Sequence, residues 1–267
     1  MQFDFSRRNI IVLGSSKGIG FATAKMLAAN GANVCIVGRN ADALQHAMNE
    51  INALPKGESH NHLSVCCDLT SSASVDLLWQ HVAKKWDGCV DSLVLNAGGP
   101  PIAKNVANVT RDEWLTYFQS LFLSQIDLVS RCLKHMQENK FGRIVSIASS
   151  SIIEVLPGLV ISSAIRSALA TWLKNLAHEV TIEGINVNTI VLGRVDTERI
   201  RSLDQNRAEQ SSSSVDAVKA SSCINIPAGR YGTPEEVANA ITFLLSREAS
   251  YISGSNITVD GGAIKAY

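Results

Sequence analysis

Seven short apolar runs, separated by longer segments of helical period, are the feature that most constrains the fold of this chain. A helix between two consecutive strands lets those strands run parallel, since a parallel pair needs a long crossover. The pattern therefore predicts an α/β fold, a single doubly wound domain of Rossmann type with a seven-stranded parallel sheet flanked by helices. The expected strands cover residues 9–14, 32–38, 63–67, 92–96, 143–148, 185–191 and 256–259, and the expected helices cover 18–30, 40–54, 71–86, 110–137, 160–183 and 234–246.

Length and composition place the whole chain, residues 1–267, in one domain. At 267 residues it is near the upper size for one hydrophobic core, and no low-complexity linker divides it. Apolar residues make up 46% of the chain and charged residues 18%, which suits a sheet buried on both faces. We expect a compact dinucleotide-binding domain.

Charge and cysteine usage limit the partners. The 24 basic residues balance 24 acidic ones without a basic run, so nucleic acid and anionic membranes are poor candidates and a small molecule is favoured. The apolar stretch near the N-terminus is too short for a membrane span and predicts a strand, so we expect a cytoplasmic protein. The six cysteines show no CxxC spacing, so neither disulfides nor a metal site are expected.

One segment, residues 199–227, interrupts the alternation of strands and helices. Its serine-rich middle favours a mobile substrate loop or lid over a core element. The alternative is a surface insertion without function.

A glycine-rich turn joins the first expected strand to the first expected helix. Gly14 permits the tight turn, and Gly18 and Gly20 let the backbone approach a pyrophosphate at the positive end of the helix. The strand–turn–helix context makes this pattern specific, so we predict a dinucleotide site. The predicted contacts in the turn are Gly14, Ser16, Lys17, Gly18, Ile19 and Gly20.

The residue at the end of the second strand indicates which dinucleotide binds. An acidic residue there pairs with a free ribose 2′-hydroxyl, whereas a cation accepts a 2′-phosphate. The residue is Arg39, and Lys17 in the glycine turn is a second candidate cation. We therefore favour NADP(H) over NAD(H); the alternative for Arg39 is a solvated arginine at a helix start.

The glycine turn has the spacing GxxxGxG, and with the motifs that follow it the chain resembles the short-chain dehydrogenase/reductase family, in particular its 3-oxoacyl-carrier-protein reductases. These motifs are Asp68, Asn96-Ala97-Gly98, GRIVSIASS, Leu192-Gly193 with Asp196-Thr197, and the C-terminal GRYGTPEEVANAITFLLS, YISG and VDGG, so the resemblance covers nearly the whole chain. It implies that Asp68 and Leu69 flank the adenine, Asn96 and Gly98 the adenine ribose region, and Thr197 the nicotinamide.

The resemblance fails at the reaction site. Members of this family use a tyrosine as the acid or base, a lysine four residues later, a serine and an asparagine. Ser149 stands at the serine position, but Ser162 replaces the tyrosine, Arg166 the lysine and Leu121 the asparagine. The chain therefore resembles a divergent member with an atypical active site.

These replacements change the chemistry that the site can perform. Serine is a weaker acid than tyrosine by several pKa units, each worth about 1.4 kcal/mol of proton-transfer driving force. Arg166 stays charged, so it cannot shuttle protons, but it can donate to the nicotinamide ribose or to a substrate oxygen. We expect Ser149, Ser162 and Arg166 to form an altered oxygen-binding site.

Two other residues are candidate proton donors. Glu154 lies five residues after Ser149 among apolar neighbours that would raise its pKa, although a solvated loop glutamate is the alternative. Tyr117 lies one helical turn before Leu121, so it shares that face of the helix; its alternative role is packing.

Three functions are therefore compatible with the sequence. The favoured one is a divergent NADP(H)-dependent oxidoreductase acting on a carbonyl or hydroxyl compound or an acyl thioester. The others are a catalytically inactive nucleotide-binding regulator or partner subunit, and a lyase or isomerase that reuses the fold. The resemblance also implies a homodimer or homotetramer formed through the helices over 110–137 and 160–183.

Overall fold

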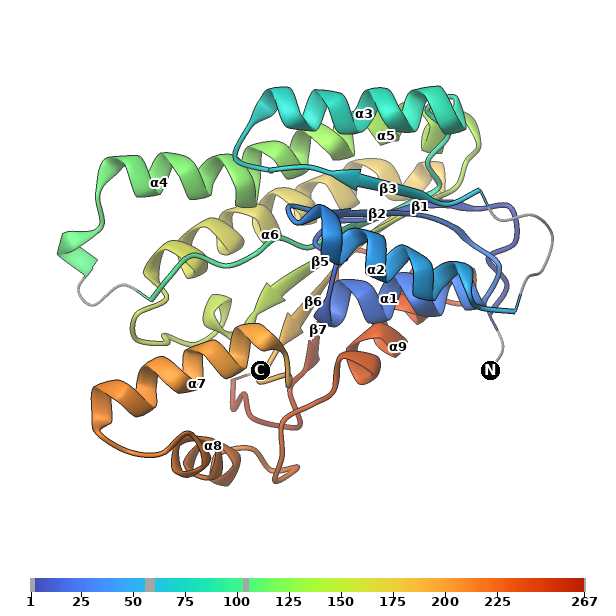
Figure 1. Ribbon diagram of the computed structural model, residues 1–267. Coiled ribbons are helices and arrows are strands. Elements are labelled where there is room, and N and C mark those ends of the chain that lie inside the picture. The colour runs from blue at the N-terminus through green and yellow to red at the C-terminus, as the bar shows by residue number, and fades with distance from the viewer. Residues whose placement is uncertain (1–2, 56–60, 103–105, 267) are drawn as a thin grey trace.

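The computed structural model of the protein describes residues 3–55, 61–102 and 106–266. Within these ranges, seven parallel strands form one sheet in the order β3-β2-β1-β4-β5-β6-β7 (Figure 1). The strand order reverses between β1 and β4, which is where open sheets of this kind bind ligands. The predicted fold class is confirmed. The strands are β1 Asn9–Val12, β2 Asn33–Gly38, β3 Leu63–Cys66, β4 Ser92–Leu95, β5 Gly142–Ser149, β6 Ile185–Leu192 and β7 Asn256–Val259.

The central strands are apolar on both faces because helices cover both faces of the sheet. In β4 all four residues are buried; Leu93 and Leu95 contribute to one hydrophobic core and Val94 to the other. Fully burying one such side chain stabilises the fold by about 1.5–3 kcal/mol. This double burial explains why the strands read as continuous apolar runs.

Helices cover both faces of the sheet as two outer layers (Figure 1). Helices α3, α5 and α6 pack on one core, and helices α1, α2 and α9 pack on the other. In the described part of the chain, no helix combines the length and apolarity needed to cross a membrane. The bounds are α1 Gly18–Ala29, α2 Ala41–Asn52, α3 Ser72–Trp86, α5 Ser124–Glu138, α6 Val160–Val180 and α9 Pro234–Leu245.

The helix expected over residues 110–137 is not continuous. It consists of α4 (Arg111–Phe118), a π-helical turn (Gln119–Leu123) and α5. The side-chain amide of Gln125 donates to the carbonyls of Ser120 and Leu121, at 3.3 and 3.1 Å. These hydrogen bonds stabilise the π-helical turn. Turns of this kind are frequent at functional sites.

The segment 199–227, expected to be a loop, is largely helical. It contains most of α7 (Glu198–Ser211) and all of α8 (Val215–Ile224). Thr197 caps α7 through the amide of Ile200, and Ser214 caps α8, so polar residues that suggested a loop act as helix caps. The mobility of this segment stays a prediction.

Helix α7 is attached to the rest of the domain by a polar cluster. Asp204, which is only 2% exposed, accepts hydrogen bonds from Arg194 after β6 and from the Tyr231 hydroxyl, each at 2.8 Å. Burial is the main cause that raises the pKa of Tyr231, so this phenol stays protonated and keeps donating. The contact fixes α7 beside the carboxyl end of β6.

Candidate functional site

The glycine turn lies at the carboxyl end of β1, and two of its glycines leave no room for a side chain. Gly14 has a φ of +57°, and a Cβ atom there would lie 2.8 Å from the carbonyl oxygen of Asn96. A Cβ atom on Gly20 would lie 2.3 Å from the carbonyl oxygen of Gly14. Asn96 also donates to that Gly14 carbonyl at 3.1 Å. The predicted cofactor-binding residues that follow β1 and β4 are therefore in contact.

The start of α1 fits the pyrophosphate of a dinucleotide. Lys17 at its N-cap position makes no side-chain capping bond, whereas α2, α3 and α9 are each capped by a side chain. Gly18 has a φ of +60°, and a Cβ atom there would meet only the methyl side of Thr197, at 3.6 Å. A helix start whose amide groups have no side-chain cap, and which a phosphate can approach closely because glycine lacks a side chain, is typical of a phosphate site.

The residues predicted around the adenosine half surround the ends of β2, β3 and β4. Arg39 is exposed, and its guanidinium lies 4.0 Å from the position of a Cβ atom on Gly98. Asp68 is exposed after β3, and its carboxylate accepts from the amide of Thr70. The remaining predicted residues pack locally: Ser16 beside Gly38, Ile19 against the core under α1, and Leu69 against α5, where its carbonyl accepts from Ser124.

Lys17 has a different partner from the one expected. Its ammonium group forms an ion pair with Glu198 at the start of α7, and both side chains are well exposed. The pair connects the glycine turn to α7. Sequence reasoning missed Glu198 because the two residues are 181 positions apart.

Arg166 joins three elements at the carboxyl edge of the sheet. Its Nη1 donates to the carbonyl of Ile147 in β5 at 2.7 Å, and its Nη2 donates to the carbonyl of Ala97 after β4 at 2.9 Å. Its Nε donates to the hydroxyl of Ser162, one helical turn earlier in α6, at 3.2 Å. The predicted pair of Ser162 and Arg166 is thus in direct contact, and Arg166 is partly buried.

The charge of Arg166 persists in this setting. Burial, and to a smaller extent the positive charge of Arg199, lowers the pKa of the Arg166 guanidinium to about 10. That value keeps the group protonated near neutral pH. The site therefore holds a fixed cation that can stabilise negative charge on an oxygen.

Leu121, which the resemblance aligns with the family's asparagine, lies in an apolar setting. Leu121 is fully buried in the π-helical turn and belongs to a small core with Ala97, Ile161 and Ile165. A leucine side chain cannot hold a water molecule by hydrogen bonds. Tyr117 packs against the same core, which is the packing role given above as the alternative to proton donation.

Two other predicted residues have local partners. Ser149 ends β5, and its hydroxyl accepts from the amide of Ser151 at 3.2 Å. Glu154 accepts from the backbone amide of Lys265 at 3.1 Å, so it connects its loop to the C-terminal segment. Its role as a proton donor stays a prediction.

Arg199 was not predicted from the sequence. It is exposed on α7 and donates from Nη2 to the carbonyl of Pro100, in the loop that also contains Ala97. The residue as a whole is exposed, but its guanidinium is partly buried at this contact, and this desolvation is the main cause that lowers its pKa; the neighbouring Tyr117 partly offsets it. The only signal in the sequence was its place two residues after Thr197, at the start of the polar segment.

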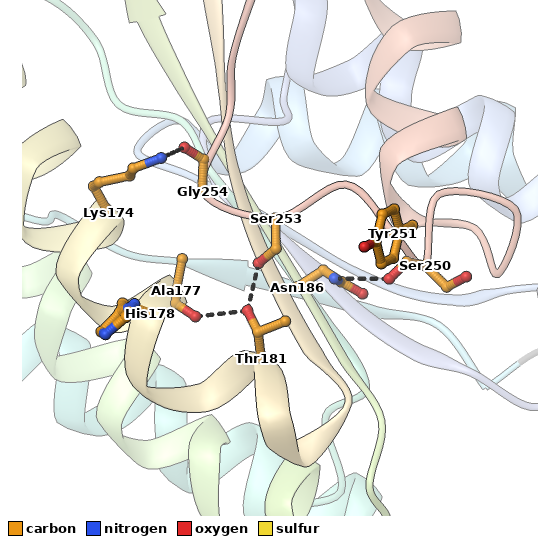
Figure 2. A pocket seen from close by; sticks show the side chains of 9 residues that line it. All are labelled: Lys174, Ala177, His178, Thr181, Asn186, Ser250, Tyr251, Ser253 and Gly254. Atoms are coloured by element: carbon orange, nitrogen blue, oxygen red, sulfur yellow. Dashed lines mark hydrogen bonds between the residues drawn. The ribbon is translucent and has the colours of Figure 1, made fainter.

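A separate pocket of about 340 Å³ lies at the opposite, amino end of β6 (Figure 2). Its polar groups largely bind one another: Lys174 donates to the carbonyl of Gly254, Asn186 donates to the carbonyl of Ser250, and the hydroxyls of Thr181 and Ser253 are 2.7 Å apart. These bonds join α6 and β6 to the turn before β7. The pocket is therefore remote from the glycine turn and from Arg166.

Comparison with known proteins identifies the family. The family model described as enoyl-(acyl carrier protein) reductase matches residues 14–263. The 3-oxoacyl-(acyl-carrier-protein) reductase MabA of Mycobacterium tuberculosis is 32% identical over 97% of this chain and 93% of its own length. The chain belongs to the short-chain dehydrogenase/reductase family, as the sequence motifs predicted.

Two similar solved structures concern the cofactor. L-sorbose reductase from Gluconobacter frateurii, complexed with NADPH and L-sorbose, has a TM-score of 0.92 and 28% identity over the full length of both chains. An NADPH-bound short chain oxidoreductase from Pseudomonas aeruginosa PAO1, described as containing an atypical catalytic center, has a TM-score of 0.86 and 29% identity over 99% of this chain and all of its own. These neighbours support NADP(H) as the cofactor, in agreement with the expectation from Arg39.

Proposed function

We propose that this chain is an NADP(H)-dependent oxidoreductase acting on a carbonyl or hydroxyl small molecule or an acyl thioester, at an atypical site formed by Ser149, Ser162 and Arg166. The observation that carries the proposal is the contact between Arg166 and Ser162 at the edge of the sheet that also carries the glycine turn. The cofactor, when bound, supplies or accepts a hydride. The protein must then stabilise charge on the substrate oxygen.

The pair of Ser162 and Arg166 suits that task. The Ser162 hydroxyl accepts from Arg166, so its own hydrogen is free to donate to a substrate oxygen. The guanidinium keeps its positive charge and stabilises an alkoxide without giving up a proton. We infer that solvent water supplies the proton, because serine is too weak an acid.

The cofactor contacts follow from the placement of the predicted residues. We propose that Gly14, Gly18 and Gly20 hold the pyrophosphate and that Arg39 binds the 2′-phosphate. We propose a smaller role for Lys17, since Glu198 already neutralises its charge. For the rest of the cofactor we propose the contacts that the resemblance implies: Asp68 and Leu69 at the adenine, Asn96 and Gly98 at the adenine ribose region, and Thr197 at the nicotinamide.

A second candidate function has one observation in its favour. Arg166 uses three N–H donors in hydrogen bonds within the protein, two of them to backbone carbonyls. A purely structural arginine would form such bonds. In that case the chain is a nucleotide-binding regulator or an inactive partner subunit. It would bind NADPH without oxidising it.

Turnover of NADPH with a panel of ketones and acyl thioesters separates the two candidates. We expect the absorbance of reduced nicotinamide to fall with at least one carbonyl compound, and the rate to drop with Ser162→Ala. The Ser163→Ala protein is the matched control, because the Ser163 hydroxyl donates to the carbonyl of Leu159 within the helix. NADPH binding without turnover across the panel supports the inactive candidate.

We also propose that the chain assembles as a homodimer or homotetramer through α4, α5 and α6, the helices over 110–137 and 160–183. Leu115 and Phe118 in α4 and Leu123 in the π-helical turn are exposed by 57%, 37% and 38%. Large apolar side chains grouped on one helical face favour association. Light scattering at micromolar concentration tests this, and a monomer would contradict it.

A further inference from the structure

Two arginines lie around the loop that follows β4. Arg166 donates to the carbonyl of Ala97, and Arg199 donates to the carbonyl of Pro100. The Nη2 atom of Arg199 lies 3.4 Å from the position of a Cβ atom on Gly99. Two guanidinium groups, one from α6 and one from α7, therefore contact the same four-residue stretch, residues 97–100.

Neither of these arginines has a carboxylate partner in the described part of the chain. The titratable groups that interact electrostatically with them are Arg199 for Arg166 and Tyr117 for Arg199. Other arginines around α7 are paired: Arg194 with Asp204, and Arg201 with Asp196. Two neighbouring positive charges without a counter-charge repel each other, so an anion between them would be stabilising.

The surroundings leave this positive charge free for a ligand. Glu198, next to Arg199 in sequence, forms an ion pair with Lys17 instead. Arg199 is exposed to solvent, and Arg166 is partly exposed. Arg199 also lies in the first turn of α7, where the helix dipole adds positive potential.

We propose that Arg199 determines substrate class by binding the carboxylate of an oxo acid, or of the matching hydroxy acid, whose reacting oxygen lies at Ser162 and Arg166. This inference rests on the proposed function, because it uses the same site. An arginine and a carboxylate match through two parallel hydrogen bonds, which gives orientation as well as affinity. The carboxylate end would hold the substrate in place while the oxo group meets the second arginine.

Binding measurements test this without requiring turnover. The protein is saturated with NADP+, which cannot reduce an oxo acid, and is titrated by calorimetry with pyruvate, acetoacetate and levulinate and with their neutral methyl esters. We expect at least one acid to bind about tenfold more tightly than its ester, the size of one charge-assisted interaction. The preferred chain length reports the distance between the carboxylate and the oxo group.

Variants on α7 identify the residue responsible. Arg199→Gln should abolish the preference for acid over ester, and Arg199→Lys should keep part of it. Arg201→Gln is the matched control, since Arg201 is on the same helix and already paired, and it should leave the preference intact. The affinity for NADP+ should be unchanged in all three.

Three results would overturn the inference. They are equal affinities for acids and esters, no binding of any acid, or a loss of NADP+ affinity in Arg199→Gln, which would make Arg199 a cofactor contact. Failure of the proposed redox function is distinguishable from these results. It would leave the acid preference in place but give no oxidation of NADPH.

Discussion

The carboxyl edge of the sheet has two sides that are built in different ways. On the side of β1–β3, the site is made by backbone: Gly14 and Gly20 leave no space for a Cβ atom, and the start of α1 between them has no side-chain cap. On the side of β4–β6, the proposed reaction site is made by side chains, with Ser162 and Arg166 in direct contact. A site made by backbone tolerates few substitutions, whereas a site made by side chains can change its chemistry while the fold stays the same.

Arg166 shows what this difference implies for the reaction side. Its side chain bonds the ends of β4 and β5 to α6. Removing it should therefore affect both stability and ligand binding. The following predictions test the comparison from the largest expected effect to the smallest.

The largest effect is expected from Gly20→Ala. The new Cβ atom would lie 2.3 Å from a backbone oxygen, so the turn must shift. We expect a loss of about 3 kcal/mol of unfolding free energy and loss of NADPH binding. The measurement is urea unfolding together with cofactor titration.

The control for this prediction is Gly232→Ala, where the nearest atom would be 3.7 Å away. It should change the unfolding free energy by less than about 0.5 kcal/mol. Equal stability of the two variants would show that the glycine turn is not constrained by its backbone.

The next effect is expected from Arg166→Gln, which removes donors from the Ala97 and Ile147 carbonyls. We expect a loss of about 2 kcal/mol, and about 1 kcal/mol for Arg166→Lys, because an ammonium group cannot span both carbonyls as a planar fork does. The same unfolding assay measures it, with exposed Arg201→Gln as the control. If Arg166→Lys matched the parent protein in stability, cofactor affinity and activity, Arg166 would have no working role.

A smaller effect is expected from Arg39→Ala, and it is confined to cofactor choice. Loss of one charge-assisted contact should weaken NADPH about tenfold and leave NADH nearly unchanged. Lys17→Ala should weaken NADPH less, since Lys17 is already paired with Glu198. Fluorescence titration of both cofactors measures this, and unchanged NADPH affinity in Arg39→Ala would contradict it.

The smallest effect is expected from restoring the family pair, Ser162→Tyr with Arg166→Lys. We expect no efficient ketone reduction, because Ser162 is buried at 7% exposure and Leu121 still cannot hold a relay water. NADPH oxidation with simple ketones measures it, and thermal unfolding confirms that the variant folds. Rapid ketone reduction by the double variant would contradict this prediction. It would show that a tyrosine at 162 and a lysine at 166 are all that the site needs for this reaction.

The sequence predicted the sheet and the glycine turn well, because both depend on local patterns. Runs such as NIIVLG and the GxxxGxG spacing each determine the local backbone, and the helices between the runs imply parallel strands. The register after Ser149 also placed Ser162 and Arg166 one helical turn apart, which their contact confirms.

Other features depend on tertiary contacts that the sequence does not show. The π-helical turn at Leu121 depends on Gln125, and the order of α7 depends on Asp204 meeting Arg194 and Tyr231. Arg199 was missed for the same reason, since its partner Pro100 is 99 residues away. The serine-rich composition that suggested a loop did not distinguish an irregular segment from two capped helices.

The most direct test of the account is isotope transfer from NADPH that carries deuterium at the transferable position. The protein is incubated with this cofactor and the oxo acid that binds most tightly, and the product is examined by mass spectrometry. The account predicts a hydroxy acid with one deuterium on the former carbonyl carbon, and less of it with Ser162→Ala. A protein that binds both NADPH and the oxo acid but forms no deuterated product would contradict the claim that the reaction side carries out redox chemistry.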